Sequence, residues 1–352
     1  MNKLWTNKIS NHTQLGGIET SVLDNGSARG TRIAWINTGT GLRYKVVLDR
    51  AMDIADAFYG QHSLAWISHV GVTSPQPMSD GGIDWLRTFG GGLLTTCGLS
   101  HVGGPEKDSF GERGVHGLIS NIPAEIESII QPDPVNGKMD MSITGTMKET
   151  KIFGPSLELR RTISATLGEA TIRIHDEVIN RANTPSPHML LYHFNFGWPL
   201  VDEGTDILWN GSWQPRFADT AKIFKEGNNF RKCPAPIESH LGTGEEVGII
   251  NPVVDGSNIS TCGLYNAKLG FALSMRFNKK QLPVLVNWQH WGPGEYVTAL
   301  EPSTNTLIGQ SKARAQNELI QIAPGETRTY DIELKIINNE AGIKLFLNNF
   351  KP

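Results

Sequence analysis

ATIRIHDEVIN, residues 170–180, alternates two kinds of side chain with a period of two residues. Positions 170, 172, 174 and 178 are apolar and share one side with Asp176, while polar and charged residues fall on the other side. This period predicts a β-strand with one buried face. TRTYDIELKII, residues 327–337, repeats the pattern, so two long strands of this kind frame the second half of the chain.

Short runs typical of strands fill much of the remaining chain. They are RIAWIN (32–37), KVVLD (45–49), MDMSITGTM (139–147), LELRRTISATL (157–167), HMLLYHFNF (188–196), FALSMRF (271–277) and LPVLVNWQHW (282–291). Turn signals such as Asn136-Gly137 and Gly292-Pro293-Gly294 separate them. Helix signals are weak and no strand–helix alternation recurs, which argues against doubly wound and barrel folds of the α/β class. We therefore predict an all-β protein, a single domain over residues 1–352 built as one large antiparallel β-sandwich with few short helices.

The charge and composition of the chain limit the kinds of partner that we expect for it. The net charge is −3 without a run of lysine or arginine, so we expect no nucleic acid partner. No apolar stretch of 18 residues exists and the N-terminal residues do not form a signal peptide, so we expect no membrane partner. Three cysteines far apart suggest reduced thiols and a cytoplasmic protein. The 38 glycines and nine tryptophans fit a hairpin-rich β protein, and also a sugar binder.

The glycine run in FGGGLLTTCGLSH, residues 89–101, excludes several familiar sites. No lysine follows it, as a P-loop requires, and it precedes a strand rather than a helix, unlike a dinucleotide-binding turn. No G-x-S-x-G motif is present. The glycines therefore predict close approach of backbone to backbone or to a ligand, and Cys97 is expected to pack in the core.

Three later stretches contain candidate site residues. GERGVHGLISN places His116 five positions before Asn121. In HMLLYHFNF, His193 and Asn195 are two residues apart and share a strand face. Glu301 ends an apolar run just before a proline, where partial exclusion of water raises a carboxylate's pKa and makes it a better base near neutral pH.

At these residues the chain resembles the aldose 1-epimerase (galactose mutarotase) superfamily, over roughly residues 20–335. It is most similar to a branch of aldose-epimerase-like proteins that carry DRAMDI-like and GGLLTTCGL-like stretches, here near residues 50–54 and 91–99. The resemblance implies a galactose mutarotase-like sandwich. It also implies that His193 is a general acid, Glu301 a general base and His116 a residue that binds and orients the sugar. Mutarotation needs no metal and no organic cofactor, and we expect none.

Four further residues remain open between a structural and a substrate-binding role. Arg50 and Asp53 form a salt bridge with each other or reach the pocket, where the planar guanidinium would bind hydroxyls or a carboxylate. Trp288 and Gln289 lie where a strand runs toward Glu301, so they offer a stacking ring and an amide for sugar hydroxyls. The chain departs from the mutarotases at residues 89–99, where their arginine-rich stretch, with its substrate-binding arginine, is absent.

The predicted function is therefore the interconversion of sugar anomers by acid–base ring opening, with a small carbohydrate as the partner. A non-catalytic carbohydrate-binding or regulatory protein on the same fold is the second hypothesis. A sugar-phosphate epimerase is the third, and it would need clustered cations, for which the sequence offers Arg50, Arg87, Arg160 and Arg161. The identity of the sugar stays open, and so does the choice between monomer and homodimer.

Overall fold

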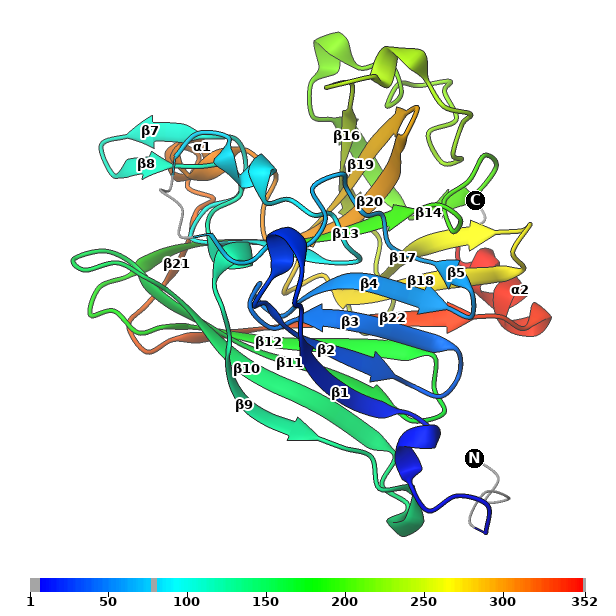
Figure 1. The fold of residues 1–352 in the computed structure, drawn as a ribbon. Coiled ribbons are helices and arrows are strands. Elements are labelled where there is room, and N and C mark those ends of the chain that lie inside the picture. Colours follow the sequence, from blue (N-terminus) through cyan, green and yellow to red (C-terminus); the bar gives the residue numbers. More distant parts are fainter. Residues whose placement is uncertain (1–6, 77–80, 351–352) are drawn as a thin grey trace.

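The computed structural model describes residues 7–76 and 81–350. The first six residues, on which the expectation about a signal peptide partly depends, lie outside this range. Antiparallel strands in three main sheets make up most of the fold (Figure 1). This architecture confirms the predicted all-β class.

The first sheet follows the order of the chain. Its strands are β1 (Gly17–Val22), β2 (Arg32–Asn37), β3 (Leu42–Val47), β4 (Asp53–Tyr59) and β5 (His62–Ser63).

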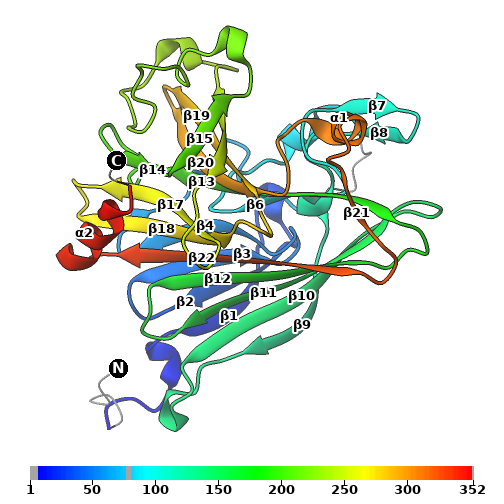
Figure 2. The same ribbon diagram turned by 180° about the vertical axis from the view of Figure 1, so that it is seen from behind.

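The second sheet has eight strands and contains both long alternating stretches. In spatial order they are β14 (Asp206–Leu208), β17 (Ile259–Asn266), β18 (Phe271–Asn278), β22 (Thr327–Ile337), β12 (Thr171–Asn180), β11 (Ser156–Thr166), β10 (Asp140–Thr150) and β9 (Glu125–Ile130). The stretches 170–180 and 327–337 form the neighbouring strands β12 and β22, in which Asp176 pairs with Tyr330. Figure 2 shows this sheet from behind, with the first sheet on its far side.

The third sheet carries the candidate site. Its order is β15 (Gly211–Pro215), β16 (Glu246–Pro252), β19 (Val284–Gly292), β20 (Glu295–Ser303), β13 (Ser186–Gly197) and β21 (Ile320–Ile322), and β6 (Thr95–Leu99) also pairs with β13. The predicted turn at Pro293-Gly294 joins β19 to β20, with Gly294 at a φ of 84° that favours glycine. This tight hairpin fixes the register that places Glu301 opposite Val286.

Few helices complete the fold, as expected. The α-helices are α1 (Gly309–Ala315), which lies beside the small hairpin of β7 (Glu106–Asp108) and β8 (Gly111–Arg113), and α2 (Glu340–Asn348), which the sequence analysis did not single out. The short 3-10 turns are η1 (His12–Gln14), η2 (Gly26–Ala28), η3 (Asp84–Arg87), η4 (Ile119–Asn121), η5 (Pro134–Asn136), η6 (Ala218–Thr220) and η7 (Glu238–His240). Within the described residues, no helix combines the length and apolarity that crossing a membrane requires.

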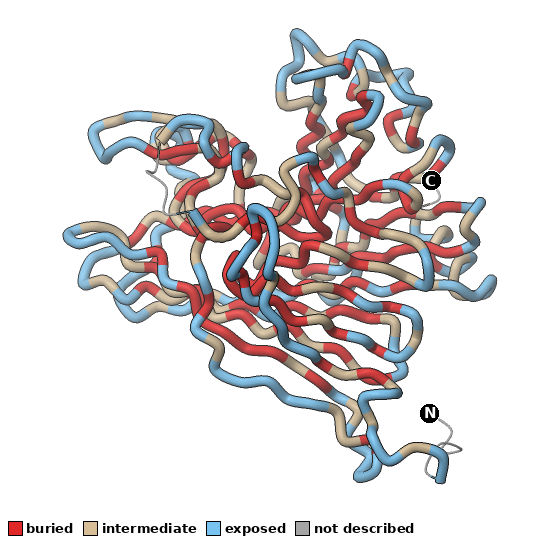
Figure 3. The backbone as a smooth tube through the Cα atoms, in the orientation of Figure 1, coloured by how far each residue is buried: buried red, intermediate tan, exposed pale blue. Residues whose placement is uncertain are grey.

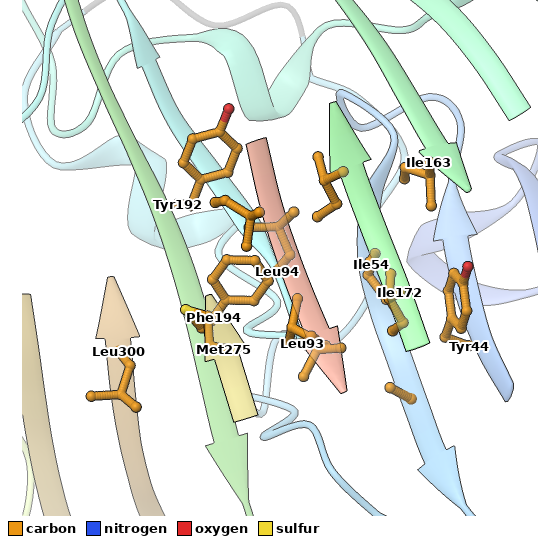
Figure 4. Close-up of a cluster of buried hydrophobic side chains, with 14 of the residues drawn as sticks. Tyr44, Ile54, Leu93, Leu94, Ile163, Ile172, Tyr192, Phe194, Met275 and Leu300 are labelled. Carbon is orange, nitrogen blue, oxygen red and sulfur yellow. The ribbon is translucent and has the colours of Figure 1, made fainter. Parts of the chain in front are cut away.

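The main hydrophobic core lies where the sheets face one another. Buried residues concentrate along the strands, and exposed residues gather in the connecting loops (Figure 3). Figure 4 shows part of this core, with side chains from all three sheets, among them Ile54, Ile172 and Phe194. A second, smaller cluster covers the opposite face of the third sheet and includes Leu191, Val247 and Val286. Successive side chains of a strand point to opposite faces, so strands such as β13, β16 and β19 contribute to both clusters.

Candidate active site

His193 and Glu301 meet on neighbouring strands of the third sheet. The register pairs Leu191 with Ser303 and Phe194 with Leu300, which places His193 of β13 across from Glu301 of β20. The Nε2 atom of His193 lies 3.3 Å from Oε1 of Glu301. Two residues separated by more than a hundred positions are thus brought together by strand pairing.

Burial controls the protonation of this pair. Only 7% of His193 and 2% of Glu301 is exposed. Desolvation lowers the pKa of His193 to about 4, and desolvation together with the negative charge of Glu245 raises the pKa of Glu301 well above its ordinary value. Both directions favour a neutral imidazole beside a protonated carboxyl over an ion pair of the two groups. Such a pair has one proton to donate and one lone pair to accept another.

Four side-chain atoms of residues that line this pocket are buried without a hydrogen bond among the described residues. They are Nδ1 of His193, Oε1 of Glu301, Nδ1 of His116 and Nε2 of His290. Buried polar atoms in folded proteins are nearly always hydrogen-bonded, so a cluster of unsatisfied ones is typical of a site that receives a ligand.

Aromatic rings wall the pocket above the pair, which has a volume of about 420 Å³. Phe89 and Trp288 lie on two sides of the His193 ring, at centroid distances of 5.2 and 5.5 Å. Trp66 contacts both of these rings at 6.0 Å, and Trp85 stacks on Phe89 at 4.4 Å. Flat apolar walls with a few polar groups between them suit a ligand that has an apolar face and polar edges.

His116 joins this pocket from the loop after β8. Its ring lies 4.9 Å from that of Trp85 and 6.4 Å from that of His193. Its backbone has a φ of 57°, held by a hydrogen bond from its N–H to Gly103 and one from Gly98 to its carbonyl. Such a conformation is uncommon outside glycine and is stabilised here by the surrounding loops. Desolvation and the nearby His193 lower the pKa of His116 well below its ordinary value.

The rim contains charged residues that the sequence analysis missed. Arg216, Glu245 and Glu295 line the pocket together with His290. The indole N–H of Trp288 donates to Glu245 at 2.5 Å, and Glu295 lies 3.3 Å from His290. No motif marks these residues, since Arg216 follows a short strand and Glu245 sits in a loop.

Arg50 and Asp53 lie outside the lining of this pocket. The Arg50 guanidinium donates to Thr73 at 2.7 Å, to the Thr88 carbonyl at 3.0 Å and to the Ser120 carbonyl. Asp53 accepts hydrogen bonds from the backbone and hydroxyl of Thr96. No ion pair joins Arg50 to Asp53 in the parts of the chain that the structure describes.

Asp53 instead belongs to a buried network that ties the three sheets together. Arg161 of β11 donates to Asp53 of β4 at 3.1 Å and to both carboxylate oxygens of Asp176 on β12, at 2.9 and 2.7 Å. Thr96 of β6 accepts from Arg161, and the Tyr192 hydroxyl on β13 donates to Asp176 at 2.7 Å. Tyr192 directly precedes His193, so this network anchors the strand that carries His193.

Gln289, Asn195 and Asn121 also lie away from the pocket lining. Gln289 follows Trp288 on β19 and points to the other face, where it donates to the Phe230 carbonyl at 2.8 Å. Asn195 is fully buried and donates to the Gly92 carbonyl at 3.1 Å, and Asn121 donates to the Thr88 hydroxyl at 3.1 Å. Alternation allows only one of two adjacent strand residues to face a pocket, and here it is Trp288.

The glycine run permits close backbone packing beside the pocket. Gly91 and Gly92 have φ angles of 70° and 85°. A Cβ atom would lie 2.6 Å from the Trp66 carbonyl oxygen at Gly91 and 2.8 Å from that of Ile54 at Gly92. The expected close approach is thus between backbones, and Cys97 is buried in the second cluster as expected.

Among residues 7–76 and 81–350, no group of three or more histidine, cysteine, aspartate and glutamate side chains is arranged to hold a metal ion.

Three packed sheets with a buried His–Glu pair on the outer face of the third define a protein of the galactose mutarotase-like fold. The chain belongs to DUF4432, a domain family of unknown function whose model matches residues 28–336. Among solved structures, a "putative aldose 1-epimerase" from Klebsiella pneumoniae is 24% identical, with a TM-score of 0.84 over 97% of this chain and 90% of that one. A galactose mutarotase-like protein from Clostridium acetobutylicum is 12% identical, with a TM-score of 0.60 over 92% and 98%. No curated protein matches the sequence.

Proposed function

We propose that the protein is an aldose 1-epimerase-like isomerase that interconverts the anomers of a sugar, with His193 and Glu301 as its acid–base pair. The observation that carries this proposal is the 3.3 Å approach of Nε2 to Oε1 at the base of an aromatic pocket. The shared fold of the structures named above supports a role with carbohydrates. Ring opening of a free sugar requires one group that accepts a proton and one group that donates a proton.

The chemistry is balanced without any other reactant. One member of the pair takes the proton of the anomeric hydroxyl, and the other gives its proton to the ring oxygen as the bond from that oxygen to C1 breaks. After rotation about the C1–C2 bond, the freed hydroxyl returns its proton to the pair and attacks the other face of the aldehyde. The new anomeric oxygen then takes the remaining proton, so the pair ends in its starting state.

His193 and Glu301 lie together on one wall of the pocket, rather than on two sides of it. The anomeric oxygen and the ring oxygen are both bonded to C1, so a pair on one side can serve both. His116, next to His193, is placed to orient the ring by a hydrogen bond from or to its unsatisfied Nδ1.

The rate of exchange is expected to follow a bell-shaped pH profile. As pH falls through about 4, His193 takes a second proton and the pair loses its acceptor, so activity falls. As pH rises through the raised pKa of Glu301, the pair loses its donor and activity falls again. Anomer exchange measured by NMR across pH checks both limbs. If activity instead fell on the acid side with a midpoint at the ordinary histidine pKa of 6.5, the lowered pKa of a buried His193 would be contradicted.

Trp288→Ala should raise KM about 3- to 10-fold and change kcat less, because the indole covers the apolar face of the sugar rather than its reacting atoms. Initial rates of anomer exchange over a range of sugar concentrations measure both constants. Trp198→Ala is the matched control, since Trp198 is exposed just beyond the end of β13. Equal KM values for the two variants would remove Trp288 from the binding wall.

A further inference from the structure

Arg216 stands between the pocket of the His–Glu pair and a second cavity. It directly follows β15, and its backbone N–H donates to the Val247 carbonyl on the neighbouring strand at 2.8 Å. The second cavity has a volume of about 390 Å³ and shares Gly104, Arg216 and Leu307 with the pocket. Arg216 therefore faces both the pocket of the His–Glu pair and the second cavity.

Arg216 forms no salt bridge with a carboxylate of the described residues. Its guanidinium lies 5.1 Å from the ring of Phe217 and forms no salt bridge there. Lys312 of α1, which lines the same second cavity, likewise forms no salt bridge within the described residues. Two cations without a salt bridge thus face one cavity.

The acidic residue in that cavity does not neutralise these cations. Glu106 is held by Arg113 at 2.7 Å and by the backbone N–H of Ser311 at 3.0 Å. Asp108, on the same hairpin, binds Arg113 at 2.7 Å and Arg314 at 3.1 Å. Both carboxylates of the hairpin are therefore engaged with Arg113 and α1, and neither forms a salt bridge with Arg216 or Lys312.

The arginines that the sequence offered for an anion are all engaged elsewhere. Arg50 binds carbonyls and a hydroxyl, and Arg87 pairs with Asp84. Arg160 pairs with two glutamates on the outer face of the second sheet, and Arg161 lies in the buried network. Arg216 is the arginine that lines the pocket of the His–Glu pair, so it occupies the role for which the 89–99 stretch has no arginine.

We propose that the substrate is an anionic aldose, whose carboxylate or phosphate group is bound by Arg216, with Lys312 as a second contact, while its anomeric carbon lies at His193 and Glu301. This inference rests on the proposed function and names the substrate class. The planar guanidinium suits either anion, because it can donate two parallel hydrogen bonds to a carboxylate or a phosphate.

The test compares matched sugars in wild type and in Arg216→Gln. Glucose and galactose are each measured beside the uronic acid and the 6-phosphate of the same sugar, by NMR anomer exchange and by titration of binding. We expect wild type to prefer one anionic sugar over the neutral sugar of the same set. This preference is the ratio of their kcat/KM values, and Arg216→Gln should lower the ratio about 10- to 100-fold. Arg216→Lys should recover part of the loss. Arg29→Gln, at an exposed arginine that lines neither cavity, should leave the ratio unchanged.

The outcomes separate this proposal from the epimerase proposal. Preference for the uronic acid or for the phosphate, lost in Arg216→Gln, supports the subsite and tells which anion it takes. The subsite is overturned if neutral and anionic sugars are exchanged with the same kcat/KM and Arg216→Gln does not change the ratio. The proposed epimerase function would still stand in that case. If no sugar is exchanged, the binding titrations test the subsite. Binding of the anionic sugar that is weakened by Arg216→Gln supports the subsite, and binding that this variant leaves unchanged overturns the subsite.

Discussion

Glu301→Gln is expected to lower kcat/KM for anomer exchange by about 10²- to 10⁴-fold, the usual contribution of a positioned acid or base. Glutamine keeps the shape of the side chain and can still contact His193 across the 3.3 Å gap. It cannot exchange a proton with the anomeric hydroxyl or with the imidazole. The loss should therefore appear in kcat, with sugar binding largely retained, and initial exchange rates measured by NMR at several sugar concentrations test this.

The two members of the pair should not act additively. Once Glu301 is replaced, His193→Ala should cost little more, because ring opening needs both the donor and the acceptor and the pair works as a unit. His175→Ala serves as the matched control, since His175 is exposed on β12 and lies 2.7 Å from Asp331, away from the pocket. Full additivity of Glu301→Gln and His193→Ala would contradict joint action of the pair.

Arg161→Met is expected to lower the free energy of unfolding by about 3–5 kcal/mol, the cost of breaking a buried ion pair from one side. Arg161 is fully buried, and its loss would leave Asp53 and Asp176 without their cation. Because these residues come from β4, β11 and β12, the effect should fall on the packing of the sheets as a whole. Equilibrium unfolding in urea measures it, with far-UV circular dichroism as the signal.

Comparing the free energy of unfolding of Arg160→Met with that of Arg161→Met shows how much of the loss is due to burial of the ion pair. Arg160 is the neighbour of Arg161 on β11 but points outward, where it pairs with Glu127 and Glu177 at 40% side-chain exposure. Exposed ion pairs contribute about 0–1 kcal/mol, so this variant should unfold close to wild type. Similar losses for Arg160→Met and Arg161→Met would refute the structural role of the buried network.

Strand patterning made most of the fold predictable. The alternation in 170–180 and 327–337 placed β12 and β22, and the hairpin at Pro293-Gly294 gave the boundary between β19 and β20. These features are local, because a period of two and a turn signal depend only on neighbours in sequence. Helix α2 (Glu340–Asn348) was not singled out, since its apolar face is short and its stability depends on packing beside β18.

Motifs marked three residues of the site, and the strand that runs toward Glu301 marked Trp288, which also lines the pocket. The resemblance led to His193, Glu301 and His116, which the structure brings into one pocket. Gln289 could have been set aside from alternation alone once Trp288 was assigned to the pocket. Arg216 had no such signal, because its place depends on how a short edge strand pairs with β16.

The catalytic role of the His193–Glu301 pair is tested most directly by saturation-transfer NMR of anomer exchange across neutral aldoses, deoxy sugars, uronic acids and sugar phosphates. Wild type is compared with the His193→Ala/Glu301→Gln double variant. The proposed function predicts accelerated exchange for at least one sugar in wild type and background exchange in the double variant. Saturable binding of a sugar without accelerated exchange by wild type would contradict it and would identify a carbohydrate-binding protein on the same fold.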